Sequence, residues 1–285
     1  ITLYEGKQVN YYLDEHNAWK LSRQMLEDSI AEAKRFGVHV KAIVVINPGN
    51  PTGSILDEEN IRMIIQFARE HDLTILADEV YQENVYESGM RFVSFAKAMT
   101  DMDIHDIALF SFHSTSKGFL GESGHRGGYF ETRNIDSEVS AQLLKLQSVS
   151  LCANLPGQVA VFCMVKPPLP GSASFALYEQ EKNAILSELK KRASMLADGL
   201  NKIPGIVCNR VTGAMYAFPR IEIPVGRTDT EYCMALLEAA GICVVPGSGF
   251  GQIPGTAHFR TTILPPTKKM EEVIEKIAGF HKQYK

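Results

Sequence analysis

A lysine surrounded by hydroxyl groups follows an apolar stretch near the middle of the chain. The segment FSFHSTSKG, from Phe110 to Gly118, places Ser114 close to Lys117, and Arg126 follows in the sequence RGGY. Hydroxyls and an arginine can bind an anion, whereas a lysine amine can act as a nucleophile. A lone lysine in a loop is usually a solvated surface residue, but the apolar residues directly before this one favour a site at the end of a strand.

A carboxylate occupies a similar position in an earlier segment. The apolar run from Leu73 to Ala77 ends at Asp78, and Glu79 and Tyr81 follow closely. An acid that leaves an apolar strand costs free energy to bury unless it meets a cation or a metal ion, so we expect a cationic partner for Asp78. An apolar run ending in Asp-Glu also describes the magnesium-binding strand of P-loop ATPases, but that class requires GxxxxGK[ST], which the sequence lacks.

Two further polar groups lie near expected strand ends. In NPGNPTG, residues 47–53, the prolines restrict the backbone and can hold the Asn50 amide outward, although an Asn-Pro pair often marks only a turn. In the segment 257–264, strand alternation places Arg260 on the face opposite Phe259. Its fork of donors suits a carboxylate, while an edge-strand arginine in solvent is an equally valid interpretation.

The elements that would position these residues alternate between strands and helices in the first half. Apolar runs at 42–46, 73–77, 107–112 and 128–130 predict strands, and periodic apolar positions in 61–68, behind the acidic residues of 57–59, predict a helix. This order predicts an α/β fold whose mostly parallel sheet has helices on both faces. Ligands of such sheets lie beyond the carboxyl ends of the strands.

The second half predicts a different arrangement. After three closely spaced prolines, a long helix is expected from about 174 to 201. It is followed by short strands and two amphipathic helices, at 215–218, 242–245 and 259–263 for the strands and around 232–239 and 270–277 for the helices. We therefore place a boundary near Ser172, with the C-terminal part of a larger ligand-binding domain in 1–172. The bridging helix and a smaller α+β domain occupy 173–285.

Composition restricts the partners of the chain. Its 285 residues are 45% hydrophobic, and the net charge of −4 comes from 33 acidic and 29 basic residues without a basic cluster. No apolar run approaches the roughly 20 residues of a membrane span. The 5 cysteines are widely separated and form no CxxC pair, so they predict neither disulfides nor a zinc site and favour a reducing compartment. We expect small-molecule partners, and no metal, nucleic acid or membrane.

Together these segments resemble the class I aminotransferases, most closely the alanine aminotransferase branch. The segments NYYLDE, VINPGNPTG, LADEVYQENVY, SFHSTSKG, RGGY, GICVVPGSGFGQ and HFRTTILPP occur in the same order over essentially the whole chain. The resemblance implies the fold type I large domain of the pyridoxal 5′-phosphate (PLP) transferases, here incomplete, with the small C-terminal domain. It also implies PLP as the cofactor, bound by the domain in 1–172.

The resemblance gives catalytic roles to three residues. Lys117 would form the Schiff base with PLP and, once released, move the proton between the substrate Cα and the cofactor C4′. Asp78 would pair with the pyridinium nitrogen and keep it protonated, which lets the ring act as an electron sink. Tyr81 would hydrogen-bond the 3′ oxygen of the ring.

The resemblance also implies which residues bind without reacting. Asn50 would share the 3′ oxygen with Tyr81 and contribute to the substrate site, while Ser114 and Arg126 would hold the phosphate. Arg260 would bind the α-carboxylate of the substrate.

The activity implied is ping-pong transfer of an amino group between L-alanine and 2-oxoglutarate, which gives pyruvate and L-glutamate. Glutamate:glyoxylate aminotransferases, 1-aminocyclopropane-1-carboxylate synthases and carbon-sulfur lyases share these motifs or the cofactor residues. Aminotransferase-like modules also serve as ligand sensors in transcription regulators. The family implies a homodimer, and its N-terminal portion is absent before Ile1, so we expect a truncated chain. A cytoplasmic location is expected, with a mitochondrial one as the alternative.

Overall fold

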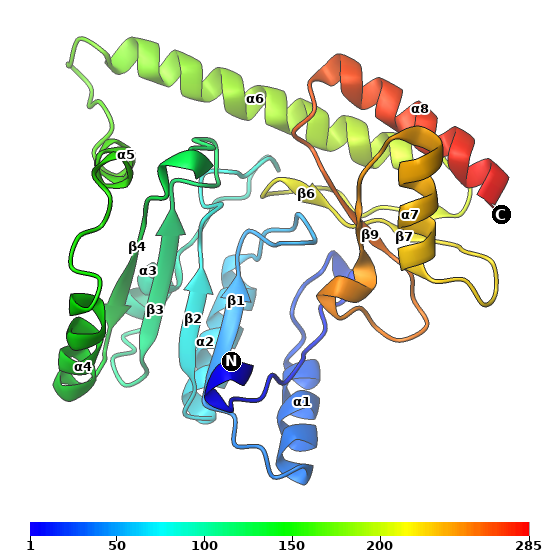
Figure 1. Cartoon of the computed structure of the whole chain (residues 1–285). Helices are drawn as coiled ribbons and strands as arrows, with labels where there is room; N and C mark the ends of the chain where they lie inside the picture. The colour runs from blue at the N-terminus through cyan, green and yellow to red at the C-terminus, as the bar shows by residue number, and fades with distance from the viewer. Residues whose placement is uncertain (285) are drawn as a thin grey trace.

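The structure is a computed structural model that describes residues 1–284. A four-stranded sheet organises the first half in the order β1 (Ala42–Ile46), β2 (Thr74–Asp78), β3 (Leu109–Ser114) and β4 (Gly128–Arg133). The first three strands are parallel and β4 runs antiparallel to β3 (Figure 1). The predicted α/β class with a mostly parallel sheet is confirmed.

Three helices build the core on one side of this sheet: α1 (Arg23–Arg35), α2 (Glu58–Glu70) and α3 (Phe95–Asp101). α2 begins where the sequence indicates, because the Asp57 side chain caps it by accepting a hydrogen bond from the Asn60 N–H. Its apolar positions Ile61, Ile64 and Ile65 are fully buried, and they pack with the inward side chains of β1 and β2 in one hydrophobic cluster. Periodicity therefore predicted both the helix and its buried face.

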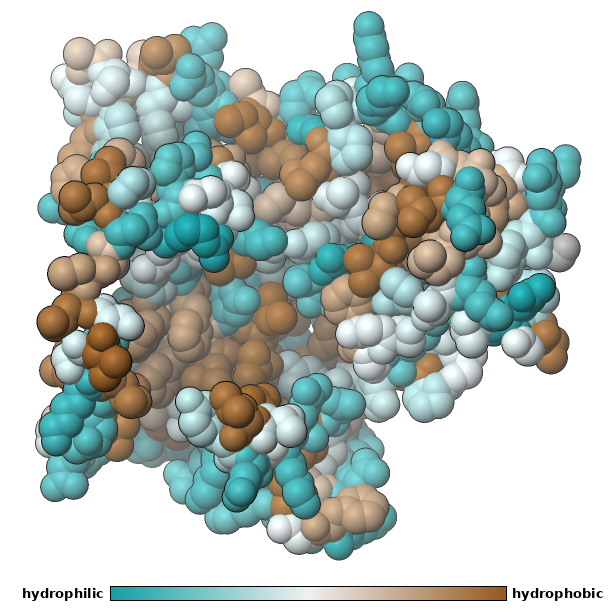
Figure 2. All heavy atoms as spheres, in the orientation of Figure 1, coloured by the Kyte–Doolittle hydropathy of each residue, from teal (hydrophilic) through white to brown (hydrophobic). Residues whose placement is uncertain are grey.

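The opposite face of the sheet is apolar and partly open. Val44, Phe112 and Phe130 keep 48%, 36% and 37% of their surface exposed. In Figure 2 this face is a brown recess bounded by teal and white side chains. The helices that follow the sheet, α4 (Ser137–Ser148) and α5 (Leu155–Val165), also expose most of their apolar side chains, because α4 has no buried residue and α5 buries only Gly157.

The second half has its own hydrophobic core. The long helix α6 (Phe175–Leu200) spans the top of the molecule in Figure 1 and packs against α8 (Thr267–Tyr284), and α7 (Asp229–Ala240) also contacts α8. Short strands complete the core: β5 (Ile206–Val207) pairs with β7 (Arg220–Ile221), and β6 (Tyr216–Ala217), β9 (Phe259–Thr262) and β8 (Val245–Pro246) form a second sheet. Single turns of 3-10 helix lie at Thr2–Tyr4, Glu15–Asn17, Ser123–His125 and Gly247–Phe250.

The long helix and the two amphipathic helices predicted in this half are confirmed. The strand expected at 242–245 is wrong for most of its length, since β8 begins at Val245 and residues 242–244 only lead into it. α7 ends at Gly241, which caps it with a φ of 67°. The next apolar residues therefore leave the helix and enter a strand of two residues rather than a long one.

The two cores are joined by main-chain hydrogen bonds. The Thr212 N–H donates to the Gly53 carbonyl at 2.8 Å, and the Ala214 N–H donates to the Asn84 carbonyl at 3.0 Å. Tyr81 and Tyr86, although they follow β2, belong to the hydrophobic cluster of the second half. The loops after β1 and β2 are thus tied to the C-terminal half, while the boundary near residue 172 stays a prediction.

Candidate active site

Asp78 is the last residue of β2 and lies on the open face of the sheet. Ile75 and Ala77, which alternate with it, point into the buried core, and the register places Asp78 between Ile46 and Phe112 of the neighbouring strands. The carboxylate is half-buried and accepts a hydrogen bond of 3.3 Å from the Val80 N–H. Burial raises its pKa, although the Val80 bond and the charge of Lys117 oppose that rise.

Lys117 lies just beyond the end of β3 and is exposed. Its ammonium acts electrostatically on Asp78, so the amine and the carboxylate gather at the same edge of the sheet. Within residues 1–284 the Lys117 amine makes no hydrogen bond or ion pair. An amine without a partner, close to a half-buried carboxylate, is available to react with a ligand.

Asn50 and Arg260 meet across the two halves of the chain. The Arg260 guanidinium donates through Nη1 to the Asn50 Oδ1 at 3.0 Å. Its Cζ also lies 4.6 Å from the ring centroid of Tyr216 and 4.9 Å from that of Phe250. Neither Tyr216 nor Phe250 was among the residues proposed from sequence, where positions 215–218 were only expected to form a strand.

The loop that carries Asn50 is held from both sides. The Asn47 N–H donates to the Asp78 carbonyl at 3.0 Å, and the Asn47 Oδ1 accepts from the Leu56 N–H at 2.9 Å. On the other side, a Cβ on Gly53 would lie 2.0 Å from the Tyr216 carbonyl oxygen, and the φ of Gly53 is +68°. Only glycine allows this close approach, which brings Asn50 beside β6 and β9.

Tyr81 is almost fully buried, at 2% exposure, and its hydroxyl lies 2.9 Å from the Tyr216 hydroxyl. Burial is the largest cause that raises the Tyr81 pKa above its ordinary value, and the negative charge of Asp78 adds to the rise. The phenol therefore stays protonated at neutral pH and can act as a hydrogen-bond donor.

Ser114, the last residue of β3, and Arg126, just before β4, are linked through shared neighbours rather than by a hydrogen bond to each other. The Ser114 hydroxyl donates to the Gly127 carbonyl at 3.0 Å and accepts from the Ser116 N–H at 3.1 Å. Arg126 donates to the Ser123 carbonyl at 2.8 Å and to the Ser116 hydroxyl at 3.5 Å. Ser116 thus links the two residues proposed to bind a phosphate, and it was not predicted.

Four charged side chains in this region have no oppositely charged partner at salt-bridge distance among the described residues: Asp78, Lys117, Arg126 and Arg260. Elsewhere on the protein, most arginines and many lysines form ion pairs, for instance Arg62 with Glu58 at 2.7 Å. The candidate site thus has one unpaired carboxylate, one unpaired amine and two unpaired guanidinium groups. Such a set suits a ligand that carries both a cationic and an anionic end, because each charge then gains a partner.

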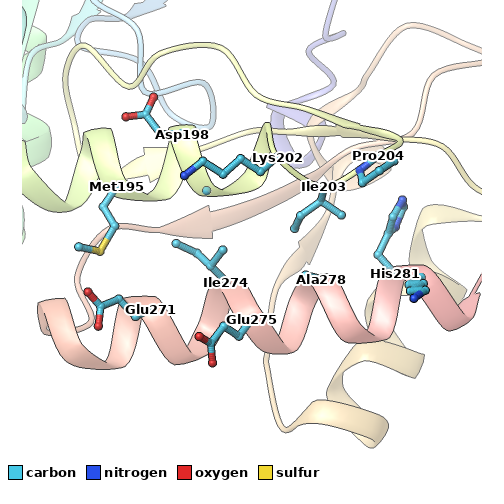
Figure 3. A pocket seen from close by; sticks show the side chains of 12 residues that line it. Met195, Asp198, Lys202, Ile203, Pro204, Glu271, Ile274, Glu275, Ala278 and His281 are labelled. Carbon is cyan, nitrogen blue, oxygen red and sulfur yellow. The ribbon is translucent and has the colours of Figure 1, made fainter.

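Two cavities lie elsewhere in the described residues and are lined by none of these side chains. A groove of about 1050 Å³ lies between α6 and α8, with Met195, Ile203 and Ile274 on its apolar wall (Figure 3). A smaller cavity of about 390 Å³ is lined mostly by polar residues, among them Glu79 and His113. In the part of the chain that the structure describes, no group of histidine, cysteine, aspartate and glutamate residues could hold a metal ion.

The comparisons with known proteins identify the family. The chain belongs to the aminotransferases of class I and II, whose family description matches residues 1–277. A probable mitochondrial alanine aminotransferase of Dictyostelium discoideum is 48% identical over 297 aligned positions, covering 100% of this chain and 56% of that protein. Alanine aminotransferase 1 of Homo sapiens is 48% identical, covering 97% and 58%.

Solved structures agree with this assignment. An alanine aminotransferase from Pyrococcus furiosus superposes with a TM-score of 0.82 at 30% identity, covering 99% of this chain and 66% of that one. The chain spans about half the length of the curated relatives it matches. None of the helices within residues 1–284 is both long and apolar enough to cross a membrane.

Membership of the family implies PLP as the cofactor, and the residues present fit that molecule. Asp78 offers an unpaired carboxylate for a ring cation, Lys117 an unpaired amine for an aldehyde, and Arg126 an unpaired guanidinium for a phosphate. The charges of these groups match the donors and acceptors that PLP carries.

Proposed function

We propose that this chain carries the catalytic residues of an alanine aminotransferase, which transfers an amino group between L-alanine and 2-oxoglutarate and forms pyruvate and L-glutamate. The observation that carries the proposal is the placement of Asp78 and Lys117 at the carboxyl ends of two parallel neighbouring strands, β2 and β3, where their charges interact. Identities of 45–49% to proteins named alanine aminotransferases over nearly the whole chain support the choice of substrates.

When bound, PLP would supply an electron sink for the negative charge that develops at the substrate Cα. Lys117 is the amine that would hold the cofactor covalently and carry the proton to and from that carbon. Asp78 would keep the ring nitrogen protonated, and its half-buried position strengthens this pairing relative to one in water. Tyr81 and Asn50 would hydrogen-bond the ring oxygen, while Ser114 and Arg126 would bind the phosphate.

Arg260 would bind the α-carboxylate that both substrates share. Its guanidinium is already oriented by Asn50 and by two aromatic rings, so little side-chain entropy is lost when a carboxylate binds. Because the α-carboxylate is common to amino acids and 2-oxo acids, Arg260 cannot by itself select alanine. Substrate choice in this proposal therefore depends on the similarity to the named relatives.

A homodimer and a cytoplasmic location complete the proposal. The exposed apolar side chains of α5, among them Leu155, Val159 and Phe162, favour burial against other protein surface. A mitochondrial location is the alternative, since the relative from Dictyostelium discoideum is named mitochondrial. Sedimentation of the purified protein tests the homodimer, and imaging of a tagged protein in cells tests the location.

The decisive experiment is spectroscopic and kinetic. The protein incubated with PLP is expected to show a visible absorption band that Lys117→Ala abolishes, whereas Lys145→Ala, an exposed lysine on α4, leaves it unchanged. Addition of alanine should bleach the band, and 2-oxoglutarate should restore it. A band that does not depend on Lys117 would refute the cofactor assignment. Restoration by glyoxylate but not by 2-oxoglutarate would correct the acceptor.

A further inference from the structure

Tyr216 touches both the proposed cofactor site and the proposed substrate site. It lies on β6, where it pairs with Thr262 of β9. Arg260 is two residues before Thr262 on the same strand, so the side chains of Tyr216 and Arg260 are diagonal neighbours on one face of the sheet. This register explains why the guanidinium lies 4.6 Å from the centre of the Tyr216 ring.

The guanidinium of Arg260 is enclosed on more than one side. Phe250, from the turn before β9, approaches it at 4.9 Å, and Asn50 accepts its Nη1 hydrogen bond. A cation held against aromatic faces keeps its remaining N–H groups in a defined direction without losing its charge. The ring of Tyr216 therefore acts on the orientation of Arg260 rather than on its charge.

The hydroxyl of Tyr216 acts on a different residue. It lies 2.9 Å from the hydroxyl of Tyr81, and the two rings meet edge to face at 88°. Each phenol has one proton to donate. If Tyr81 donated to Tyr216, no proton would be left for the ring oxygen of a cofactor.

Nearby charges favour the opposite direction of this hydrogen bond. The positive charge of Arg260 lies against the Tyr216 ring and makes Tyr216 the better donor. Arg260 also acts on Tyr81, but there the negative charge of Asp78 has the larger effect and makes Tyr81 the better acceptor. Tyr81 then keeps its own proton, and the bond that it receives strengthens the bond that it gives.

We propose that Tyr216 is a positioning residue that serves both sites, its ring orienting Arg260 for the substrate carboxylate and its hydroxyl donating to Tyr81 so that Tyr81 can donate to the cofactor. The role in cofactor binding rests on the function proposed above. The backbone supports such a role, because the Tyr216 carbonyl is packed against Gly53 and its strand is paired with β9.

Two substitutions separate the two roles. Tyr216→Phe keeps the ring and removes the hydroxyl, and Tyr216→Leu removes both. The matched control is Tyr86→Phe, which removes another buried tyrosine hydroxyl of the same core, one whose hydrogen bonds go to the Ala214 carbonyl and the Asn84 amide rather than to Arg260 or Tyr81.

The role of the Tyr216 hydroxyl is tested by titrating the PLP-loaded protein with pH and measuring the pH at which its visible absorption band is half converted. Tyr216→Phe is expected to raise this midpoint by about half a pH unit, because a weaker donor at Tyr81 stabilises the deprotonated cofactor less. The Tyr86→Phe midpoint should equal that of the wild type. An unchanged midpoint in Tyr216→Phe would overturn the assignment of the hydroxyl.

The ring is tested without cofactor. Acetate, a carboxylate that cannot react, is titrated into the unloaded protein and followed by the NMR shifts of arginine side-chain N–H groups. Tyr216→Leu should weaken acetate binding about 5-fold, while Tyr216→Phe stays within about 2-fold of the wild type. Equal binding by all three proteins would overturn the role of the ring. Because this arm needs no PLP, it decides the point even if the wild type fails to bind the cofactor.

Discussion

Glu79 provides a prediction that depends on the fold alone. Its side chain follows Asp78 but points to the other face of the sheet, where it is 6% exposed and its Oε1 accepts a hydrogen bond of 2.9 Å from the Phe95 N–H. Burial raises its pKa from 4.5 to about 7, and the negative charges of Glu131 and Asp78 add to the rise. The perturbation is Glu79→Gln, which keeps an acceptor for Phe95 and removes the titrating proton.

The expected size follows from the pKa of Glu79. A rise from 4.5 to about 7 corresponds to about 3 kcal/mol of folding free energy. Below pH 4.5 the carboxyl is protonated in the folded and the unfolded chain, and no penalty exists. Between pH 4.5 and 7 the unfolded chain loses this proton while the folded chain keeps it, so stability falls with rising pH until the full penalty applies above pH 7.

Urea unfolding of the unloaded wild type and of Glu79→Gln at pH 5 and pH 8 measures this penalty. The stability of the variant relative to the wild type should increase by about 2 to 3 kcal/mol between the two pH values. Glu275→Gln, an exposed position in the middle of α8, is the matched control and should change by no more than about 0.5 kcal/mol. If the difference in unfolding free energy between Glu79→Gln and the wild type is the same at pH 5 and pH 8, the buried carboxyl does not titrate as argued.

Three further predictions concern the candidate site. Asp78→Ala should lower transamination about 100-fold or more while the fold persists, because a partly buried ion pair with the cofactor is lost, typically about 3 to 5 kcal/mol; near-normal turnover would reject the pairing. Gly53→Ala should destabilise the protein by about 2 kcal/mol or more in urea, since its Cβ would lie 2.0 Å from the Tyr216 carbonyl oxygen at a φ of +68°. If Gly53→Ala unfolds at the same urea concentration as the wild type, the loop of residues 47–53 can shift to accommodate the added Cβ. Arg260→Lys should raise the KM of the amino acid and of the oxo acid by a similar factor, about 10-fold, because both share the α-carboxylate; a change for one substrate only would move Arg260 to a different role.

Much of the fold could be predicted from local patterns. α2, α7 and α8 have periodic apolar positions, and α7 carries a complete capping box between Thr228 and Glu231. α4 and α5 were not predicted. In α5 nearly every position is apolar, so no buried stripe can be distinguished in the sequence.

The candidate site was predictable in its parts but not in its contacts. Asp78 and Lys117 could be found because each follows an apolar run, which places it at the carboxyl end of a strand. Ser116 and Phe250 carry no such signal, since a serine in a polar loop and a phenylalanine among glycines are common. Their partners, the guanidinium groups of Arg126 and Arg260, become visible only in three dimensions.

The sequence by itself determined the chemistry available at the strand ends, because strand alternation, helix periodicity and turn residues act over a few positions. Only the tertiary structure decided which of these groups meet. Tyr81 and Tyr216 are 135 positions apart, and Asn50 and Arg260 are 210 apart. Such contacts arise where main-chain hydrogen bonds at Gly53 and Ala214 join the two halves of the chain, and no local pattern encodes which distant segments will meet there.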